Sequence, residues 1–300
     1  MDETMRAVTL PDGRRLEALL RGASSGPVVV VHHGSPGSAL EIPALEAAAA
    51  ARGLRLVLPS RAGYAGSSRD AGRDVAAAAR DTAWLLDALG VGRFATIGWS
   101  GGGPHAIACA ALLEGRCAAA ISAAGPAPYL PGELEFTDGM DEENVKEFEA
   151  AIEGGAAYES MLAEHRDSIL AFVPTASTTA RDLFGGLASD RDNDGTTPEE
   201  VAGVHRSMAV GLASSIDGWL DDDQAFIHAW GFDVGAVGAP VSVWYGDHDR
   251  MVPARHGEWL AAHVRGAVER RFPDEGHLTL VLAHPGEILD ALVELAEGAW

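Results

Sequence analysis

Residues 94–115, FATIGWSGGGPHAIACAALLEG, place one serine in a glycine-rich turn between two apolar segments. The β-rich run at 94–97 predicts a strand, and the alanine-rich run at 106–113 predicts a helix. A strand that turns abruptly into a helix leaves little room for Cβ atoms, so small residues are needed around its apex. Four glycines between positions 98 and 103 meet this requirement, with Ser100 at the apex.

A similar alternation of short apolar strands and alanine-rich helices runs through residues 1–126 and returns at 233–300. Continuous apolar strands separated by helices indicate a mostly parallel sheet that is covered on both faces. Residues 11–13, Pro-Asp-Gly, stand between the first two apolar runs and predict a β-hairpin. Residues 127–232 break the alternation with acidic, mostly helical segments. We therefore expect a doubly wound α/β core interrupted by a helical insertion at 127–232.

Length and composition narrow the class of protein. The chain has 300 residues, of which 47% are hydrophobic and 22% are charged, as is ordinary for a globular protein. Its net charge of −22 disfavours nucleic acid and anionic membranes as partners, because both would repel it. We expect a small-molecule substrate and a monomer or homodimer.

The two cysteines, Cys109 and Cys117, are too few for a disulfide framework. We expect both to be buried thiols in a reducing, cytoplasmic compartment. The acidic N-terminus does not fit the pattern of a signal peptide, and no segment has the length and apolarity of a membrane span.

The residues from Gly98 to Gly102 match the pattern G-x-S-x-G. In a strand–turn–helix context this pattern predicts a nucleophile elbow, which lifts a serine hydroxyl above the edge of a sheet. The alternative is a serine that only caps the following helix. The predicted strand before the turn and helix after it favour Ser100 as a nucleophile.

A serine hydroxyl becomes a good nucleophile only when a base removes its proton, and this requires a histidine. His277 follows the predicted last strand, and loops at the carboxyl ends of parallel strands meet above the sheet. His105 is too close to Ser100 along the same helix to face its hydroxyl. The imidazole needs a carboxylate in turn, and the preceding strand is followed by Asp247 and Asp249. We favour Asp249, with Asp247 as the alternative.

Acyl transfer also needs N–H donors for the oxyanion that develops on the substrate carbonyl. The backbone N–H of Gly101 directly follows the serine and is predicted to be one donor. The loop HHGSPGS at residues 32–38 follows an apolar strand, and we favour its Ser35 N–H as the second. Gly34 gives this loop conformational freedom, and His33 is expected to order it by hydrogen bonding.

Five segments, in this order, resemble the landmarks of the α/β-hydrolase superfamily, in the branch with proline iminopeptidases and bacterial esterases. They are HHGSPGS, SRAGYAGSS, GWSGGGPHA, GDHDRMVP and DEGH. The resemblance covers residues 5–126 and 233–298 and implies an α/β-hydrolase fold with a Ser–Asp–His triad. We expect no cofactor and no metal ion. The chain departs from the family motif D-R-P-G-Y-G-x-S at Ser60, and from the iminopeptidase motif HGGPG at Ser35.

The resemblance also implies that residues 127–232 form a helical cap whose aromatic side chains shape the substrate pocket. Trp99, beside the nucleophile, is expected to contact substrate. The other candidate pocket residues are Tyr129, Phe148, Phe172, Phe184, Trp219, Phe226 and Trp230. Three consecutive aspartates at 221–223 are interpreted as a solvated helix end, with an amine-recognising site as the alternative.

Residues 190–195, DRDNDG, begin like a calcium-binding EF-hand loop. Position twelve of such a loop needs a glutamate, and the chain has Val201 there. Helix capping is the favoured interpretation, with Thr197 as the N-cap and Pro198 in the first turn.

Together these features predict a serine hydrolase that cleaves a small carboxylic ester or lactone through an acyl-enzyme on Ser100. A proline iminopeptidase-like aminopeptidase is one alternative, because an acidic cap could hold an ammonium group. A hydrolase homologue that only binds a ligand is another.

Overall fold

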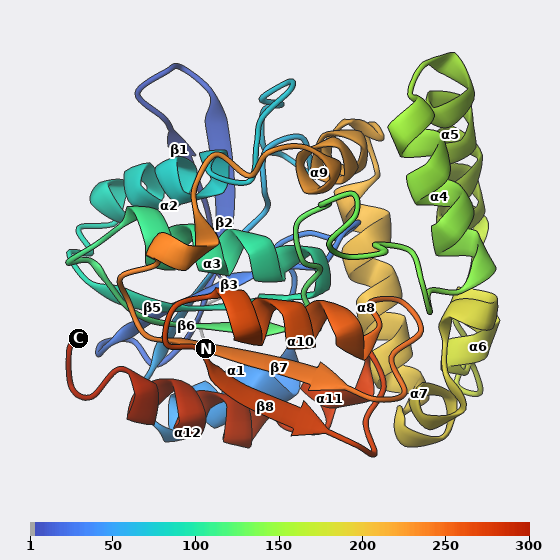
Figure 1. Cartoon of the computed structure of the whole chain (residues 1–300). Helices are drawn as coiled ribbons and strands as arrows, with labels where there is room; N and C mark the ends of the chain where they lie inside the picture. Colours follow the sequence, from blue (N-terminus) through green and yellow to red (C-terminus); the bar gives the residue numbers. More distant parts are fainter. Residues whose placement is uncertain (1–3) are drawn as a thin grey trace.

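The computed structural model describes residues 4–300, and within them eight strands form one sheet in the order β1-β2-β4-β3-β5-β6-β7-β8 (Figure 1). The strands are β1 Thr4–Thr9, β2 Arg15–Gly22, β3 Val28–His32, β4 Arg55–Pro59, β5 Phe94–Trp99, β6 Cys117–Ala123, β7 Val241–Gly246 and β8 Val268–Phe272. Strand β2 pairs antiparallel with β1 and β4, and all the other neighbours pair in parallel. The predicted hairpin at 11–13 and the mostly parallel sheet are confirmed.

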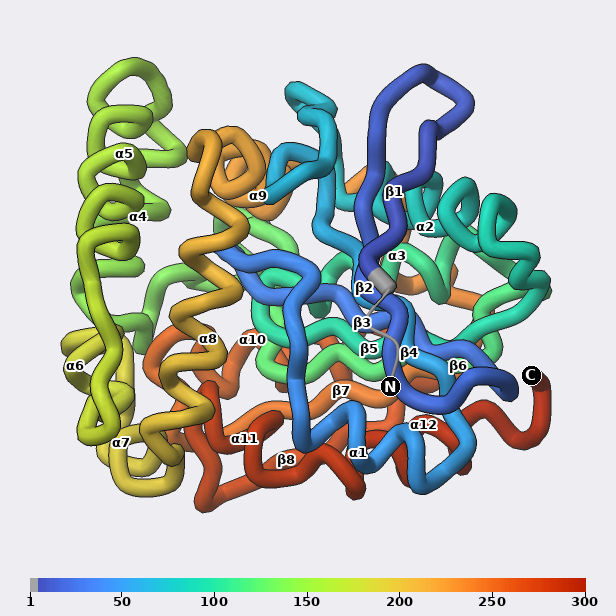
Figure 2. The backbone as a smooth tube through the Cα atoms, turned by 180° about the vertical axis from the view of Figure 1, so that it is seen from behind, coloured from blue at the N-terminus to red at the C-terminus, as the bar shows by residue number. Residues whose placement is uncertain are grey.

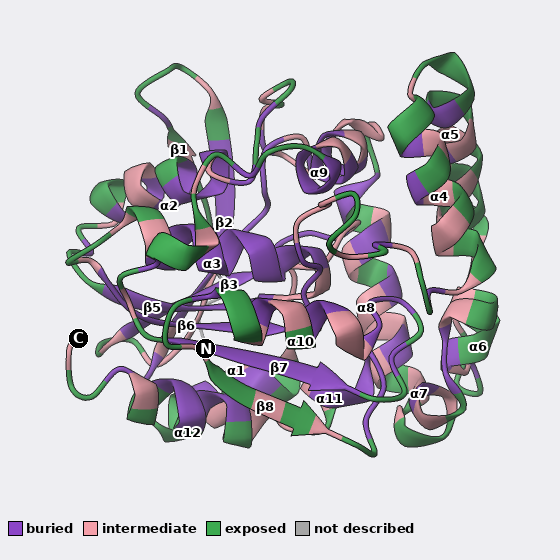
Figure 3. Cartoon of the chain, viewed as in Figure 1, coloured by how far each residue is buried: buried purple, intermediate pink, exposed green. Residues whose placement is uncertain are grey.

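Helices cover both faces of the sheet because its central strands are apolar on both sides. All residues of β3, β6 and β7 are buried (Figure 3). Helices α2, α3 and α10 pack on one face, and α1 and α12 pack together on the other (Figure 1). The core helices are α1 Pro43–Ala51, α2 Ala77–Ala88, α3 Gly103–Leu112, α10 Ala254–His263, α11 Thr279–Leu282 and α12 Pro285–Leu295. The doubly wound α/β core is therefore confirmed.

The chain between β6 and β7 is helical, and its helices lie beside the edge of the sheet at which β7 and β8 end (Figures 1 and 2). They are α4 Glu142–Glu153, α5 Ala156–Ala171, α6 Ala180–Phe184, α7 Asp190–Gly195, α8 Pro198–Gly211 and α9 Asp217–Ile227. The chain also forms short 3₁₀ helices, which are η1 Ser100–Gly102 after β5, η2 Gly185–Leu187 after α6 and η3 Val234–Ala236 before β7. The parallel strands thus present their carboxyl ends to the inserted helices, which is where a site on this fold is expected.

The segment that resembles a calcium loop is helical. Residues 190–195 form α7, whose N-cap Ser189 makes a capping box with Asp192. Thr197 makes the same arrangement with Glu200 at the start of α8, with Pro198 in the first turn. The prediction of helix capping by Thr197 is confirmed.

Cys109 and Cys117 are buried free thiols, as expected. No helix within residues 4–300 combines the length and apolarity that crossing a membrane requires.

Candidate active site

Ser100 lies at the turn between β5 and α3, with its backbone in the left-handed region at a φ of +54°. Residues with a side chain rarely adopt this conformation, and it is typically retained where the surrounding structure enforces it. The turn is tight because its neighbours lack side chains: a Cβ on Gly98 would collide with the Gly102 carbonyl. A Cβ on Gly102 would collide with the carbonyl of His32 at the end of β3. The glycines predicted around the serine therefore allow the turn to pack against the neighbouring strand.

His277 and Asp249 form a buried pair at the ends of β8 and β7. Nδ1 of His277 lies 2.7 Å from Oδ2 of Asp249. The other Asp249 oxygen accepts hydrogen bonds from the N–H groups of Met251 and Val252, at 2.9 and 2.8 Å. These bonds hold the carboxylate toward the imidazole. The alternative carboxylate, Asp247, is directed instead to Arg271, at 2.8 and 3.0 Å.

The environment of His277 favours its protonated form. Burial lowers the pKa of His277, but the Asp249 carboxylate outweighs burial and raises the pKa above its ordinary value of 6.5. The Asp249 carboxylate would therefore stabilise the imidazolium that forms when His277 accepts a proton.

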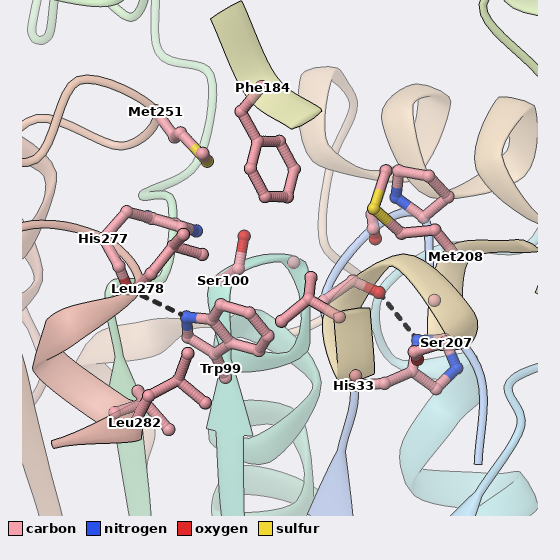
Figure 4. A pocket seen from close by; sticks show the side chains of 18 of the residues that line it. His33, Trp99, Ser100, Phe184, Ser207, Met208, Met251, His277, Leu278 and Leu282 are labelled. Atoms are coloured by element: carbon pink, nitrogen blue, oxygen red, sulfur yellow. Dashed lines mark hydrogen bonds between the residues drawn. The ribbon is translucent and has the colours of Figure 1, made fainter. Parts of the chain in front are cut away.

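Ser100 and His277 line one cavity of about 590 Å³ (Figure 4). The serine hydroxyl points into the cavity with the His277 ring beside it, although no hydrogen bond joins the two side chains in the described chain. Catalytic contacts of this kind often tighten only when substrate is bound. Trp99 Nε1 donates to the His277 carbonyl at 3.2 Å, and the two rings lie 5.7 Å apart. Trp99 therefore supports the loop that carries His277.

The two predicted oxyanion donors belong to residues of the same cavity wall, Ser35 and Gly101. A Cβ on Gly34 would lie 3.4 Å from Ser100 Cβ, so the loop after β3 passes directly beside the serine. Within residues 4–300, no backbone or side-chain acceptor binds the Ser35 N–H. This donor is therefore free to bind a substrate oxygen.

The sequence matches the protein-family model described as alpha/beta hydrolase fold, over residues 27–283. The chain belongs to the α/β-hydrolase fold family. No curated protein matches this hydrolase by sequence.

Solved structures resemble this hydrolase over nearly the whole chain. A bromoperoxidase from Bacillus anthracis has a TM-score of 0.69 and 19% identity, with 98% of this chain and 100% of that chain covered. An enol-lactonase from Burkholderia xenovorans has a TM-score of 0.66 and 17% identity, covering 97% and 100%. An esterase from Thermogutta terrifontis has a TM-score of 0.64 and 20% identity, covering 99% of each. Identities this low show the fold alone.

Of the predicted pocket residues of the hydrolase, five line the cavity and three do not. Those in the wall are Trp99, Phe148, Phe184, Trp219 and Phe226. The Tyr129 ring packs on Phe136, and the Trp230 ring packs on Phe232, each at 5.8 Å. Both lie where the chain passes between the core and the inserted helices, so they pack that junction. Phe172, at the end of α5, packs on His205 at 5.4 Å.

The three aspartates at 221–223 are buried, so their interpretation as a solvated helix end is wrong. Helix α9 packs between the core and α4, and each carboxylate meets donors there. Asp221 pairs with Arg69 at 2.8 Å, and Asp223 accepts from the Tyr158 hydroxyl at 2.6 Å. Asp222 pairs with two buried arginines. Buried charges are tolerated when they are paired in this manner.

Asp192 also supports the site, although no sequence pattern pointed to it. This fully buried carboxylate of α7 accepts hydrogen bonds from the backbone N–H groups of His277, Leu278 and Thr279, at 3.1, 2.7 and 3.1 Å. It therefore holds the backbone that carries the predicted base. The only local signal was the capping pattern of Ser189 and Asp192, which gives no sign of a partner 85 residues away.

Proposed function

We propose that this hydrolase is a serine esterase or lactonase that cleaves a small carboxylic ester through an acyl-enzyme on Ser100. The observation that carries the proposal is that the imidazole of the buried His277–Asp249 pair shares one cavity with a serine held at a φ of +54°. A strained serine next to an oriented imidazole is the arrangement that nucleophilic catalysis needs. A helix-capping serine would need neither.

The proposed reaction uses these groups in turn. Neutral His277 takes the proton from Ser100 Oγ while that oxygen forms a bond to the substrate carbonyl carbon. The N–H groups of Gly101 and Ser35 bind the oxyanion, and Asp249 stabilises the imidazolium. The carbonyl re-forms as the alcohol leaves with the proton from His277. Water then attacks the acyl-enzyme by the same route and releases the carboxylic acid.

The cavity supports a small substrate. Its volume of about 590 Å³ lies in the range of small-molecule pockets, roughly 300–1,000 Å³. Its wall contains aromatic and aliphatic side chains, among them Trp99, Phe184 and Leu278, that can pack on an acyl chain, together with polar and acidic side chains. The similar structures include an enol-lactonase and an esterase, which agrees with this choice.

The proposal is tested with a panel of p-nitrophenyl esters and small lactones on the wild type and on Ser100→Ala. We expect turnover by the wild type and a loss of at least about 1,000-fold in Ser100→Ala. A fluorophosphonate should label Ser100 in the wild type only. Undiminished activity in Ser100→Ala would overturn the mechanism, and a wild type with neither turnover nor label would point to a ligand-binding homologue.

A second candidate, an aminopeptidase of the proline iminopeptidase type, is favoured by one feature of the cavity wall. Glu147 and Asp223 both line the cavity, and no arginine or lysine pairs with either among the described residues. Burial and the neighbouring Glu147 carboxylate raise the pKa of Asp223 well above its ordinary value. A substrate ammonium group would relieve this repulsion.

The two candidates are separated with proline p-nitroanilide and p-nitrophenyl acetate as substrates. An aminopeptidase should prefer the first, and Asp223→Asn and Glu147→Gln should raise KM for it while leaving KM for the acetate unchanged. Glu143→Gln is the matched control, because Glu143 lies on the same helix and lines the cavity but is exposed. Equal KM values for the amine substrate in all variants would exclude this candidate.

A further inference from the structure

The motif SRAGYAGSS had no role in the sequence-based mechanism, yet its Arg61 reaches the loop after β3. Arg61 Nη1 donates to the His33 carbonyl, and Nη2 donates to the Gly34 carbonyl at 3.0 Å. Nη2 also lies 2.9 Å from Ser35 Oγ. One buried guanidinium thus binds three consecutive residues beside the serine.

The Gly34 carbonyl belongs to the same peptide unit as the Ser35 N–H. This unit is trans, so its C=O and N–H point in opposite directions. A group that fixes the carbonyl therefore fixes the direction of the N–H. Arg61 binds the carbonyl side of this peptide unit, and the Ser35 N–H on the opposite side is left for the oxyanion.

His33 holds the same carbonyl from a second direction. Its Nε2 can only accept from the Arg61 backbone N–H, at 3.1 Å, so its Nδ1 carries the proton and donates to the Gly34 carbonyl at 2.7 Å. Burial and the Arg61 charge hold the pKa of His33 well below its ordinary value, in agreement with this neutral form. The peptide plane is therefore bound by two donors of fixed geometry.

Asp222 fixes Arg61 in turn, and it comes from helix α9 of the insertion. Its Oδ2 lies 2.6 Å from Arg61 Nη2 and accepts from the Tyr64 hydroxyl at 2.9 Å, and it also accepts a hydrogen bond from the Ser35 hydroxyl. Its Oδ1 pairs with Arg73 at 2.5 Å. The carboxylate is fully buried and has acceptor bonds on both oxygens. Its bonds therefore set the orientation of both the guanidinium and the Ser35 side chain.

We propose that Asp222 and Arg61 are positioning residues that aim the Ser35 N–H at the substrate oxyanion, so that the inserted helices complete the oxyanion hole. The inference rests on the proposed function. In this inference the SRAGYAGSS loop positions an oxyanion donor, and α9 must be packed on the core for the transition state to bind well. Neither residue contacts the reacting atoms, so their effect should fall on the rate and not on substrate binding.

Asp221 provides a matched control, because it is the adjacent buried carboxylate of α9 and also pairs with an arginine of the core. Its partner Arg69 binds Asp221 and Asp217 and does not reach residues 33–35. Asp221→Asn thus weakens the docking of α9 without touching the oxyanion loop. A purely structural effect of α9 should appear equally in Asp221→Asn and Asp222→Asn.

The test compares kcat, KM and inhibition by phenylboronic acid in the wild type, Asp222→Asn, Arg61→Lys, Ser35→Ala and Asp221→Asn. We expect kcat to fall about 10- to 100-fold in Asp222→Asn and Arg61→Lys, less than the complete loss of an oxyanion donor. KM should stay within about twofold. The inhibition constant of the tetrahedral boronate should rise in parallel with the loss in kcat, because its oxygen occupies the oxyanion position.

Removing Asp222 leaves two buried arginines less well paired, and the variant can fail to fold. Ser35→Ala removes the contacts of the hydroxyl with Asp222 and Arg61 but keeps the Ser35 N–H. It therefore tests the inference even when Asp222→Asn does not fold, with an expected loss of about 3- to 10-fold in kcat. Two results would overturn this inference and leave the proposed function intact. One is an equal kcat in folded Asp222→Asn, Arg61→Lys and Asp221→Asn, and the other is an unchanged kcat in Ser35→Ala. A wild type without turnover would overturn the proposed function as well.

Discussion

The carboxylate of Asp192 lies 3.1 Å from the backbone nitrogen of His277, although the two residues are 85 positions apart and belong to different parts of the fold. Asp192 also accepts a hydrogen bond from Ser189 at 2.7 Å, so α7 holds it in place. The insertion thereby supports the segment that carries the proposed base. Asp222, also of the insertion, contacts Ser35. Residues of the insertion therefore support both the proposed base and the proposed oxyanion hole.

Asp192→Asn should lower kcat about 10- to 100-fold, because an amide oxygen alone cannot accept all three backbone N–H groups and the imidazole shifts. Asp192 also contributes to the raised pKa of His277, so the acidic limb of the pH–rate profile should move to lower pH. Steady-state kinetics from about pH 5 to pH 9 measure both effects. Asp190→Asn is the control, because Asp190 is exposed on the same helix and pairs with the exposed Arg181. A folded Asp192→Asn with wild-type kcat would contradict this assignment.

The sequence led to Ser100, Asp249 and His277 because each follows a strand, and the carboxyl ends of parallel strands meet at one edge. Periodicity also located the strands and the helical insertion. Asp192 and Asp222 could not be found in this way, because their partners are 85 to 187 positions away. A run of three aspartates indicates a solvated surface on composition alone. The burial of these aspartates depends on arginines that pair with Asp221 and Asp222 and on the Tyr158 hydroxyl that binds Asp223.

The pH dependence of the reaction follows from the His277–Asp249 pair. The base must be neutral, and its pKa is raised above 6.5, so kcat/KM should rise with pH through a midpoint above 6.5. Asp249→Asn should lower that midpoint and reduce kcat about 10,000-fold, as the same substitution of the triad carboxylate does in a serine protease. A midpoint at or below 6.5 in the wild type would contradict the pairing.

The same shift has a consequence for stability. Because the pKa of His277 is raised in the folded state, the pair stabilises the fold at pH below 6.5. That contribution is lost as the pH rises through the folded-state pKa. Urea unfolding of the wild type and Asp249→Asn should therefore differ most at the acidic end of the range. A difference that grows toward alkaline pH would have the wrong sign.

The elbow should be intolerant of a methyl group at Gly102. A Cβ there meets the backbone carbonyls of His32 and His33, which cannot move without displacing β3. We expect Gly102→Ala to lower the free energy of unfolding by about 1–3 kcal/mol and to reduce labelling of Ser100 by a fluorophosphonate. Gly92→Ala is the control, because a Cβ at Gly92 would meet no atom of residues 4–300 within 4 Å. Similar unfolding curves for the two variants would refute this account of the glycine pattern.

Phe184 should set the length of the acyl group that the hydrolase accepts. Its ring projects from the end of α6 into the space above Ser100 (Figure 4). Phe184→Ala should raise the ratio of kcat/KM for p-nitrophenyl octanoate to that for the acetate by about 10-fold, the scale of discrimination that a hydrophobic pocket provides.

Phe172→Ala is the matched control for Phe184→Ala, because Phe172 is an aromatic residue of the insertion that lies outside the cavity wall and packs on His205. The ratio of kcat/KM for the octanoate to that for the acetate should be the same in Phe172→Ala as in the wild type. The sequence predicts both phenylalanines as pocket residues, and only the packing of α5 and α6 shows that Phe184 lines the cavity and Phe172 does not. An equal change of the ratio in both variants would mean that acyl length is limited elsewhere in the cavity.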